Sequence, residues 1–201
     1  MSILDGCVFM NPAAADHSAT AGFLDRAPRK AWGGAKSNPE ARADISKIHR
    51  SALKMGGQLI HSCFQKSPVG PTLREIKSDA RYLPRLADAM AELVQITVPI
   101  YDPVTWRVVC APPRRHPENN FGVALCREVA ARIGVKVHTD FAVAPKLVRV
   151  GAVFDVDRMP EAPNLIVIDD VLTTGSTMES MGNLCRECGR NAIFFTAICN
   201  R

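Results

Sequence analysis

The sequence has no apolar stretch long enough to cross a membrane. Its first residues also lack the basic start and continuous apolar core of a secretory signal peptide. Of its 201 residues, 22% are charged, 6% are aromatic and 47% are hydrophobic, a balance typical of a globular protein in water. We therefore expect a cytoplasmic protein without a membrane partner. It should have one sizeable core, or one core with an extra subdomain.

The cysteine pattern lacks the features of both a disulfide framework and a zinc site. The seven cysteines are odd in number and scattered through apolar surroundings, which is typical of reduced thiols in a cytosolic core. Cys185 and Cys188 form a CxxC pair, but neither a second pair nor a histidine at zinc spacing accompanies it. We expect no zinc.

The charge pattern lacks the signature of a nucleic-acid-binding protein. The formal net charge of +5 is spread over both halves of the chain. A mildly basic protein suits anionic small molecules as well as nucleic acid. Because no aromatic side chains are interleaved with a basic stripe, nucleic acid is not indicated.

Two widespread nucleotide-binding motifs are absent as well. No G-x-G-x-x-G dinucleotide fingerprint occurs in the sequence. The nearest candidate for a Walker phosphate loop is "GGAKS" at 33–37, which has Ala35 at the second required glycine and Lys30 at the first. This segment also follows no expected strand, so the Walker interpretation fails.

The segment 1–104 is predicted to be a mainly helical extension, or hood, with little recognisable chemistry. Residues 1–37 are rich in alanine, glycine, proline and basic residues without periodicity, and we expect them to be a partly flexible tail. Asn38-Pro39 is typical of a helix start, and apolar side chains at helical spacing predict a helix over 38–54. A second helix is expected to open at Pro84.

The segment 105–201 has the pattern of an α/β core. Continuous apolar strands that alternate with amphipathic helices predict a parallel sheet covered on both faces. In such sheets, ligands bind beyond the carboxyl ends of the strands. The expected strands are 106–113, 135–141, 164–171 and 191–200; the expected helices are 119–134 and 176–189; a long loop with a short extended piece is expected over 142–163.

The stretch "NLIVIDDVLTTGSTMES" at 164–180 carries the clearest chemistry. Residues 173–177 lie between a strand end and a helix start, where free backbone N–H groups, the helix dipole and several hydroxyls can surround a phosphate. Gly175 allows the backbone to approach the anion closely. Because no lysine lies in this turn, neutral donors would hold most of the phosphate.

Two carboxylates precede the turn and cannot bind the same phosphate. Asp169 and Asp170 instead suit the vicinal hydroxyls of a ribose, or a hydrated divalent cation. The alternative is that they only cap a strand and a helix, but two tandem carboxylates are more than a cap requires. The ligand that this order of groups describes is a ribose 5-phosphate.

At these residues the sequence resembles a known family. "LIVIDDVLTTGST" resembles the PRPP-binding motif of the type I phosphoribosyltransferases, and the chain from about 108 to 201 is most similar to their ComF, or competence-associated, group. "CAPPRRHPENNFGVALCREVAARIG" is similar to that group's proline-rich strand, basic loop and helix start. The resemblance implies a parallel-sheet, Rossmann-like phosphoribosyltransferase core.

The resemblance also implies roles for individual residues. Asp169 and Asp170 would contact the ribose hydroxyls or the attached Mg²⁺, so that these two residues bind the metal indirectly. The 5-phosphate would be bound by Thr173, Thr174, Gly175, Ser176 and Thr177. Pyrophosphate would be bound by Pro113, Arg114 and Arg115, with Lys146 or Arg149 reaching over from the long loop. An exposed, solvated arginine pair is the alternative for Arg114 and Arg115.

The Arg-Pro…Gln stretch that the ComF group has in the long loop is not evident here, and the sequence departs from the family at two further places. Thr173 stands where enzymes acting on 6-oxopurines have an acidic residue, which argues against that subclass. The ComF group usually has an N-terminal four-cysteine zinc module, whereas the first hundred residues here contain only Cys7 and Cys63.

Three functions are compatible with this pattern. The first is transfer of the 5-phosphoribosyl group of PRPP to a nitrogenous base or amine, with Mg²⁺ and release of pyrophosphate. The second is a non-catalytic sensor of PRPP or of a nucleotide containing ribose 5-phosphate. The third is an accessory or effector subunit of a DNA-uptake or defence system that binds a protein partner, or forms a homodimer, through 1–104. The sequence leaves the acceptor open.

Overall fold

The computed structural model describes residues 40–100, 102–112, 120–143 and 154–201. All of these belong to one compact unit. The expected flexible tail and the helix start at Asn38-Pro39 lie outside the described residues. In the described part of the chain, no helix has the length and apolar character needed to cross a bilayer.

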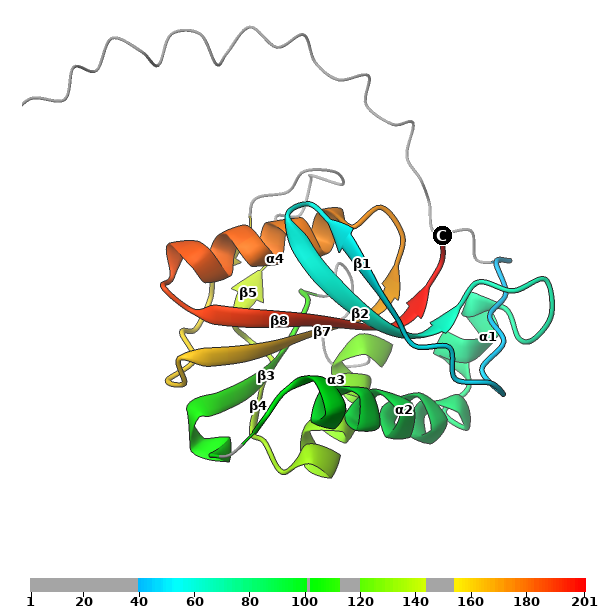
Figure 1. Ribbon diagram of the computed structural model, residues 1–201, viewed down its shortest axis with the longest axis horizontal. Coiled ribbons are helices and arrows are strands. Elements are labelled where there is room, and N and C mark those ends of the chain that lie inside the picture. The colour runs from blue at the N-terminus through cyan, green and yellow to red at the C-terminus, as the bar shows by residue number, and fades with distance from the viewer. Residues whose placement is uncertain (1–39, 101, 113–119, 144–153) are drawn as a thin grey trace, which may run out of the picture. The chain divides into compact units, whose positions relative to one another are not determined.

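A six-stranded sheet forms the centre of the molecule, in the order β1-β2-β8-β7-β3-β4 (Figure 1). The β1–β2 pair is antiparallel, and every other neighbouring pair is parallel. The predicted α/β fold with a parallel sheet is therefore confirmed. The strands are β1 (Ser51–Met55), β2 (Gln58–Gln65), β3 (Trp106–Cys110), β4 (Val137–His138), β7 (Asn164–Leu172) and β8 (Asn191–Cys199).

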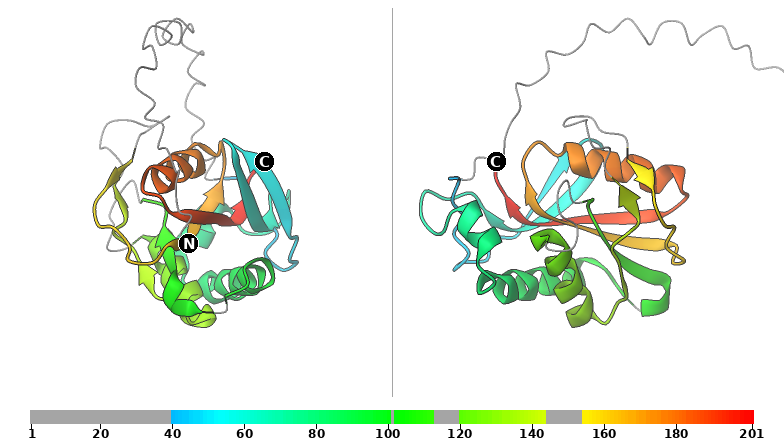
Figure 2. Two further views of the ribbon diagram at one scale, coloured as in Figure 1. Left: turned by 60° about the vertical axis from the view of Figure 1, so that its left-hand side comes forward. Right: turned by 180° about the vertical axis from the view of Figure 1, so that it is seen from behind.

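Helices cover both faces of this sheet. Helix α4 (Ser176–Glu187) lies on one face, and α2 (Tyr82–Thr97) and α3 (Phe121–Ile133) lie on the other (Figure 2). Buried side chains of β7 alternate accordingly: Ile166 and Ile168 pack in the core cluster that includes α2 and α3, and their neighbours pack with α4. Shorter elements complete the fold: α1 (Leu73–Ser78), the 3-10 turn η2 (Pro103–Thr105), and an antiparallel pair of β5 (Ala142–Val143) and β6 (Asp155–Val156).

Helix α3 begins and ends where local sequence signals predict. The side chain of Asn120 accepts hydrogen bonds from the N–H groups of Gly122 and Val123, which is a standard N-cap. Gly134 ends the helix in a left-handed conformation with φ of 71°. The predicted second helix is also present, because α2 begins at Tyr82, two residues before Pro84.

The predicted helix over 38–54 is wrong in the described part. Residues 40–50 are irregular, and Ser51–Met55 is strand β1, which pairs with β2 in register Met55↔Gln58. The glycine pair after Met55 has φ of 55° and 78°, so it makes the tight turn of a hairpin and not a helix end. Residues 51–65 therefore add two strands to the central sheet and do not form a helical hood beside it.

Candidate functional site

Strand β7 brings the two aspartates to the carboxyl edge of the parallel sheet. The strand continues through them to Leu172, and Asp169 lies opposite Thr196 of β8. The chain then bends over 173–175 and enters α4 at Ser176. The predicted order of strand, aspartates, turn and helix is thus present in the structure. Its polar groups lie where parallel sheets usually bind ligands.

The turn after β7 forms a compact cluster of hydroxyl groups. Thr174 Oγ1 and Ser176 Oγ are 3.0 Å apart, and the N–H of Ser176 donates to Thr174 Oγ1 at 3.4 Å. Gly175 is the N-cap of α4, with φ of 80° and no side-chain hydrogen bond at the cap. The first turn of α4 therefore offers backbone N–H groups and the positive end of its dipole to an anion.

The hairpin of β1 and β2 packs directly against this turn. A Cβ atom added at Gly175 would lie 2.6 Å from Met55 Cε and 3.2 Å from Met55 Cβ. Farther along the hairpin, Gln58 packs onto Gly182 of α4. Met55 and Gln58, which were expected to belong to a separate N-terminal extension, thus lie against the turn and the helix of the candidate phosphate site.

The two carboxylates have different surroundings. Asp169 Oδ1 accepts a hydrogen bond of 2.8 Å from the N–H of Asp170. Asp170 Oδ2 forms an ion pair of 2.8 Å with Lys77 Nζ, and the Asp170 side chain is only 16% exposed. The same oxygen is 3.9 Å from the position of a Cβ atom at Gly122, so Asp170 lies beside the N-terminus of α3.

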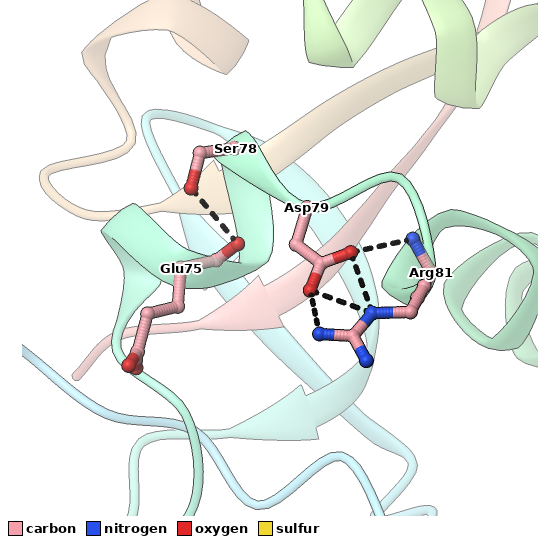
Figure 3. Close-up of polar contacts among 4 residues, drawn as sticks. All are labelled: Glu75, Ser78, Asp79 and Arg81. Carbon is pink, nitrogen blue, oxygen red and sulfur yellow. Dashed lines mark hydrogen bonds and ion pairs between the residues drawn. The ribbon is translucent and has the colours of Figure 1, made fainter.

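Lys77 comes from α1, a helix that is fastened at both ends. A capping box joins Thr72 and Glu75 at its start. At its end, Ser78 Oγ donates to the Glu75 carbonyl, and just after the helix Arg81 donates to both carboxylate oxygens of Asp79 (Figure 3). Helix α1 was not predicted from the sequence, although the pattern T-x-x-E at 72–75 is a recognisable start signal.

Arg201 is a second cation at the site that was not predicted from the sequence. Its Nε donates a hydrogen bond of 2.7 Å to the carbonyl oxygen of Thr173. The guanidinium therefore lies beside the turn, although no basic residue is present within 173–177. No local pattern predicts this contact, because it depends on β8 lying next to β7.

Two thiols lie beneath the aspartates. Cys110 and Cys126 are 3% and 0% exposed. Burial raises the pKa of Cys126 well above its usual value, and the Cys110 thiol and the two aspartates raise that pKa further. Cys126 is therefore a protonated packing residue at neutral pH and not a nucleophile.

The cysteines of the CxxC pair lie on and just after α4. Burial raises the pKa of Cys185 to about 12, which disfavours the thiolate that metal binding requires. In the described ranges, no group of three or more His, Cys, Asp or Glu residues could hold a metal ion. The expectation that zinc is absent stays a prediction.

The carboxylates fit Mg²⁺ in an indirect way only. Carboxylate oxygens are the ligands that Mg²⁺ prefers, and this ion usually keeps several waters. Asp170 Oδ2 already bonds to Lys77, so a directly coordinated ion would have to displace an ammonium group. The two aspartates therefore suit a hydrated Mg²⁺ that is coordinated mainly by oxygen atoms of the bound small molecule.

The residues predicted to contact pyrophosphate lie outside the described residues: Pro113, Arg114, Arg115, Lys146 and Arg149. The described chain on either side of the first three lies near the aspartates. The N–H of Ala111 donates to the carbonyl of Ile168 at 2.9 Å, and Asn120 caps α3 next to Asp170.

Fold and site together define a mostly parallel α/β protein with a hydroxyl-rich turn and paired carboxylates at one edge of the sheet. No family model matches the sequence, and no curated protein matches it. Solved structures that are similar to the chain include phosphoribosyltransferases.

One is an adenine phosphoribosyltransferase, with 15% sequence identity and a TM-score of 0.48 over 77% of this chain and 86% of that chain. Another, from Saccharomyces cerevisiae, was solved with an imino-altritol bisphosphate and adenine; its identity is 15% and its TM-score 0.46, over 76% and 83% of the two chains. A hypoxanthine-guanine phosphoribosyltransferase from Bacillus anthracis has 19% identity and a TM-score of 0.41 over 57% and 64%.

Proposed function

We propose that the protein binds PRPP and transfers its 5-phosphoribosyl group to a nitrogenous base or amine, with release of pyrophosphate. The observation that carries this proposal is the continuous path from the aspartates of β7 through the hydroxyl-rich turn to the N-terminus of α4. It matches the order of sugar hydroxyls and 5-phosphate in the ligand. The resemblance of "LIVIDDVLTTGST" to the type I family motif supports the same ligand, and the ComF group remains our preferred subgroup.

In this proposal the turn binds the 5-phosphate. The hydroxyls of Thr173, Thr174, Ser176 and Thr177 and the N–H groups at the start of α4 donate to its oxygens. Arg201 adds a full positive charge beside the turn, where it bonds to the Thr173 carbonyl. Charge-assisted hydrogen bonds are about twice as strong as neutral ones, so this arginine offsets the absence of a lysine in the turn.

The carboxylates of Asp169 and Asp170 accept hydrogen bonds from the ribose hydroxyls and fix the sugar in the site. During transfer, the acceptor nitrogen forms a bond to ribose C1 with its lone pair. The bond between C1 and pyrophosphate breaks, the leaving group takes the electron pair, and the acceptor's proton passes to solvent. Two fixed carboxylates near the sugar also favour the positive charge that develops on the ring.

Pyrophosphate is proposed to be bound by Arg114 and Arg115, next to Pro113, and by Lys146 or Arg149. Arginine pairs match diphosphate oxygens through two parallel hydrogen bonds. Mg²⁺, when bound to PRPP, would neutralise charge on the departing pyrophosphate. We also propose a cytoplasmic location, and a homodimer or protein partner bound through 1–104.

The proposal is tested by calorimetric titration with PRPP and Mg²⁺. We expect the wild type to bind and the double variant Asp169→Asn/Asp170→Asn to lose binding. Asp155→Asn/Asp157→Asn is a matched control, because it removes the same charge from exposed positions in and just after β6. Absence of wild-type binding would refute the proposal and leave the accessory-subunit interpretation.

A second measurement separates a transferase from a sensor. Pyrophosphate release is followed over a panel of nucleobases and amines with the wild type and the double variant. Release with one acceptor, lost in the double variant, identifies a transferase. Tight binding of PRPP without release from any acceptor identifies a sensor.

A further inference from the structure

One carboxylate of the aspartate pair already has a cation supplied by the chain itself. Lys77 Nζ lies 2.8 Å from Asp170 Oδ2, and the two side chains are 40% and 16% exposed. A contact with one largely buried partner differs from an ordinary surface ion pair. If its counter-charge is removed, a largely buried carboxylate remains without compensation.

The capping box and the buried side chains of α1 hold Lys77 in this position. The N–H of Thr72 donates to Glu75 Oε2 at 2.7 Å, while the Glu75 N–H donates to Thr72 Oγ1 at 3.1 Å. Leu73 and Ile76 anchor α1 in the core, with exposures of 3% and 1%. The lysine is therefore presented by a fixed helix and does not depend on a loop to reach Asp170.

This arrangement changes the charge balance of the site before any ligand binds. Two adjacent carboxylates repel each other, and a ribose hydroxyl that donates to them brings no positive charge. A divalent cation is one solution to this repulsion. Here the ammonium group supplies a positive charge at Asp170 Oδ2, and the second oxygen of the same carboxylate is left to accept a hydroxyl.

We propose that Lys77 is the resident counter-cation of the sugar site. It acts through Asp170 as a positioning residue and lets ribose 5-phosphate and nucleoside 5′-monophosphates bind without a divalent cation. Mg²⁺ is then required only by ligands that carry pyrophosphate. This inference rests on the proposed function, and it assigns to Lys77 the metal-independent binding of 5′-monophosphates at the same site.

The test is titration of the full chain with ribose 5-phosphate and with AMP, in EDTA and in Mg²⁺. The wild type should bind both ligands with the same Kd in the two buffers, within about twofold. In EDTA, Lys77→Met should weaken binding by about tenfold, the scale of one hydrogen bond to a charged group. Mg²⁺ should restore part of this loss, since a hydrated cation can replace the ammonium charge.

Two further variants control the measurement. Arg74→Met removes the same charge from the same helix, where Arg74 pairs at 3.3 Å with exposed Glu40, and it should leave both Kd values unchanged. Lys77→Arg keeps the charge and should retain metal-free binding. Thermal unfolding of each variant, followed by circular dichroism, shows whether α1 and the core remain folded.

A double-mutant cycle tests whether Lys77 acts through Asp170. In an Asp170→Asn background, Lys77→Met should change the metal-free Kd by less than about twofold, because the charge it balances is gone. Equal effects in both backgrounds would overturn the inference.

Two other results decide between the inference and the function on which it rests. If the wild type binds ribose 5-phosphate only with Mg²⁺, or if Lys77→Met matches Arg74→Met in EDTA, the inference is wrong and the proposed function stands. If ribose 5-phosphate, AMP and PRPP all fail to bind in both buffers, both are wrong.

Discussion

Replacing Gly175 with alanine should perturb the turn in two ways, through its backbone conformation and through its packing against Met55. The residue has φ of 80°, a region that costs an L-residue about 1–2 kcal/mol. The new Cβ would also lie 2.6 Å from Met55 Cε and 3.2 Å from Met55 Cβ, closer than normal contact. Overpacking typically costs about 1–3 kcal/mol, and the flexible end of a methionine keeps this at the lower limit. We expect Gly175→Ala to lower the free energy of unfolding by about 2–3 kcal/mol.

Urea unfolding of a double-mutant cycle with Met55→Ala separates the two contributions. Trimming Met55 should relieve the packing cost and leave the conformational cost, so the effect of Gly175→Ala should fall to about 1–2 kcal/mol. The same loss in both backgrounds would show that Met55 does not press on the turn. A loss below about 0.5 kcal/mol in the wild-type background would refute the left-handed conformation itself. Gly175→Ala should also weaken binding of ribose 5-phosphate, because the turn must shift to accommodate the methyl group.

Two further predictions concern pH and the cation beside the turn. Hydrogen bonds from the N–H and hydroxyl of Thr72 lower the pKa of Glu75 below 4.5, so the stability they supply is fully present above pH 4.5 and is lost as pH falls through the folded value. The difference in unfolding free energy between wild type and Glu75→Gln should therefore shrink as pH falls below 4.5 in urea titrations, and a constant difference would contradict the capping role. Arg201→Met should raise the Kd for ribose 5-phosphate by about tenfold, the scale of a charge-assisted hydrogen bond. The matched variant Arg186→Met, at the exposed end of α4, should leave this Kd unchanged. If calorimetric titration shows the same increase in Kd for both variants, only the net charge matters.

Local signals were enough to predict the elements that carry the motif. An asparagine before α3 and a glycine after it mark both ends, and the apolar run of β7 leads into the turn as expected. These features depend on residues close together in sequence. Helix caps and continuously buried strands can therefore be predicted from the sequence alone.

Tertiary contacts account for what the sequence could not indicate. The apolar residues before Gly56 have helical spacing. They nevertheless form strand β1, because β2 pairs with β8 on one side and the hairpin turn places β1 along the other side of β2. Lys77 and Arg201 have no signature as site residues, because Lys77 reaches the aspartate pair from α1 and Arg201 meets the turn where β8 passes β7. The motif could be predicted from its own residues, but its cations could not.

The sheet order has a consequence for how the protein folds during synthesis. Strand β8 pairs with β2 on one side and with β7 on the other, although both of these strands are made earlier. Until β8 emerges from the ribosome, β2 and β7 each have an edge of unpaired N–H and C=O groups, which can pair with other chains. Parallel pairing between distant segments is also slow. A nascent chain stalled before residue 191 should therefore be prone to aggregation, and the edge that carries the aspartates should become ordered only when β8 enters between β2 and β7.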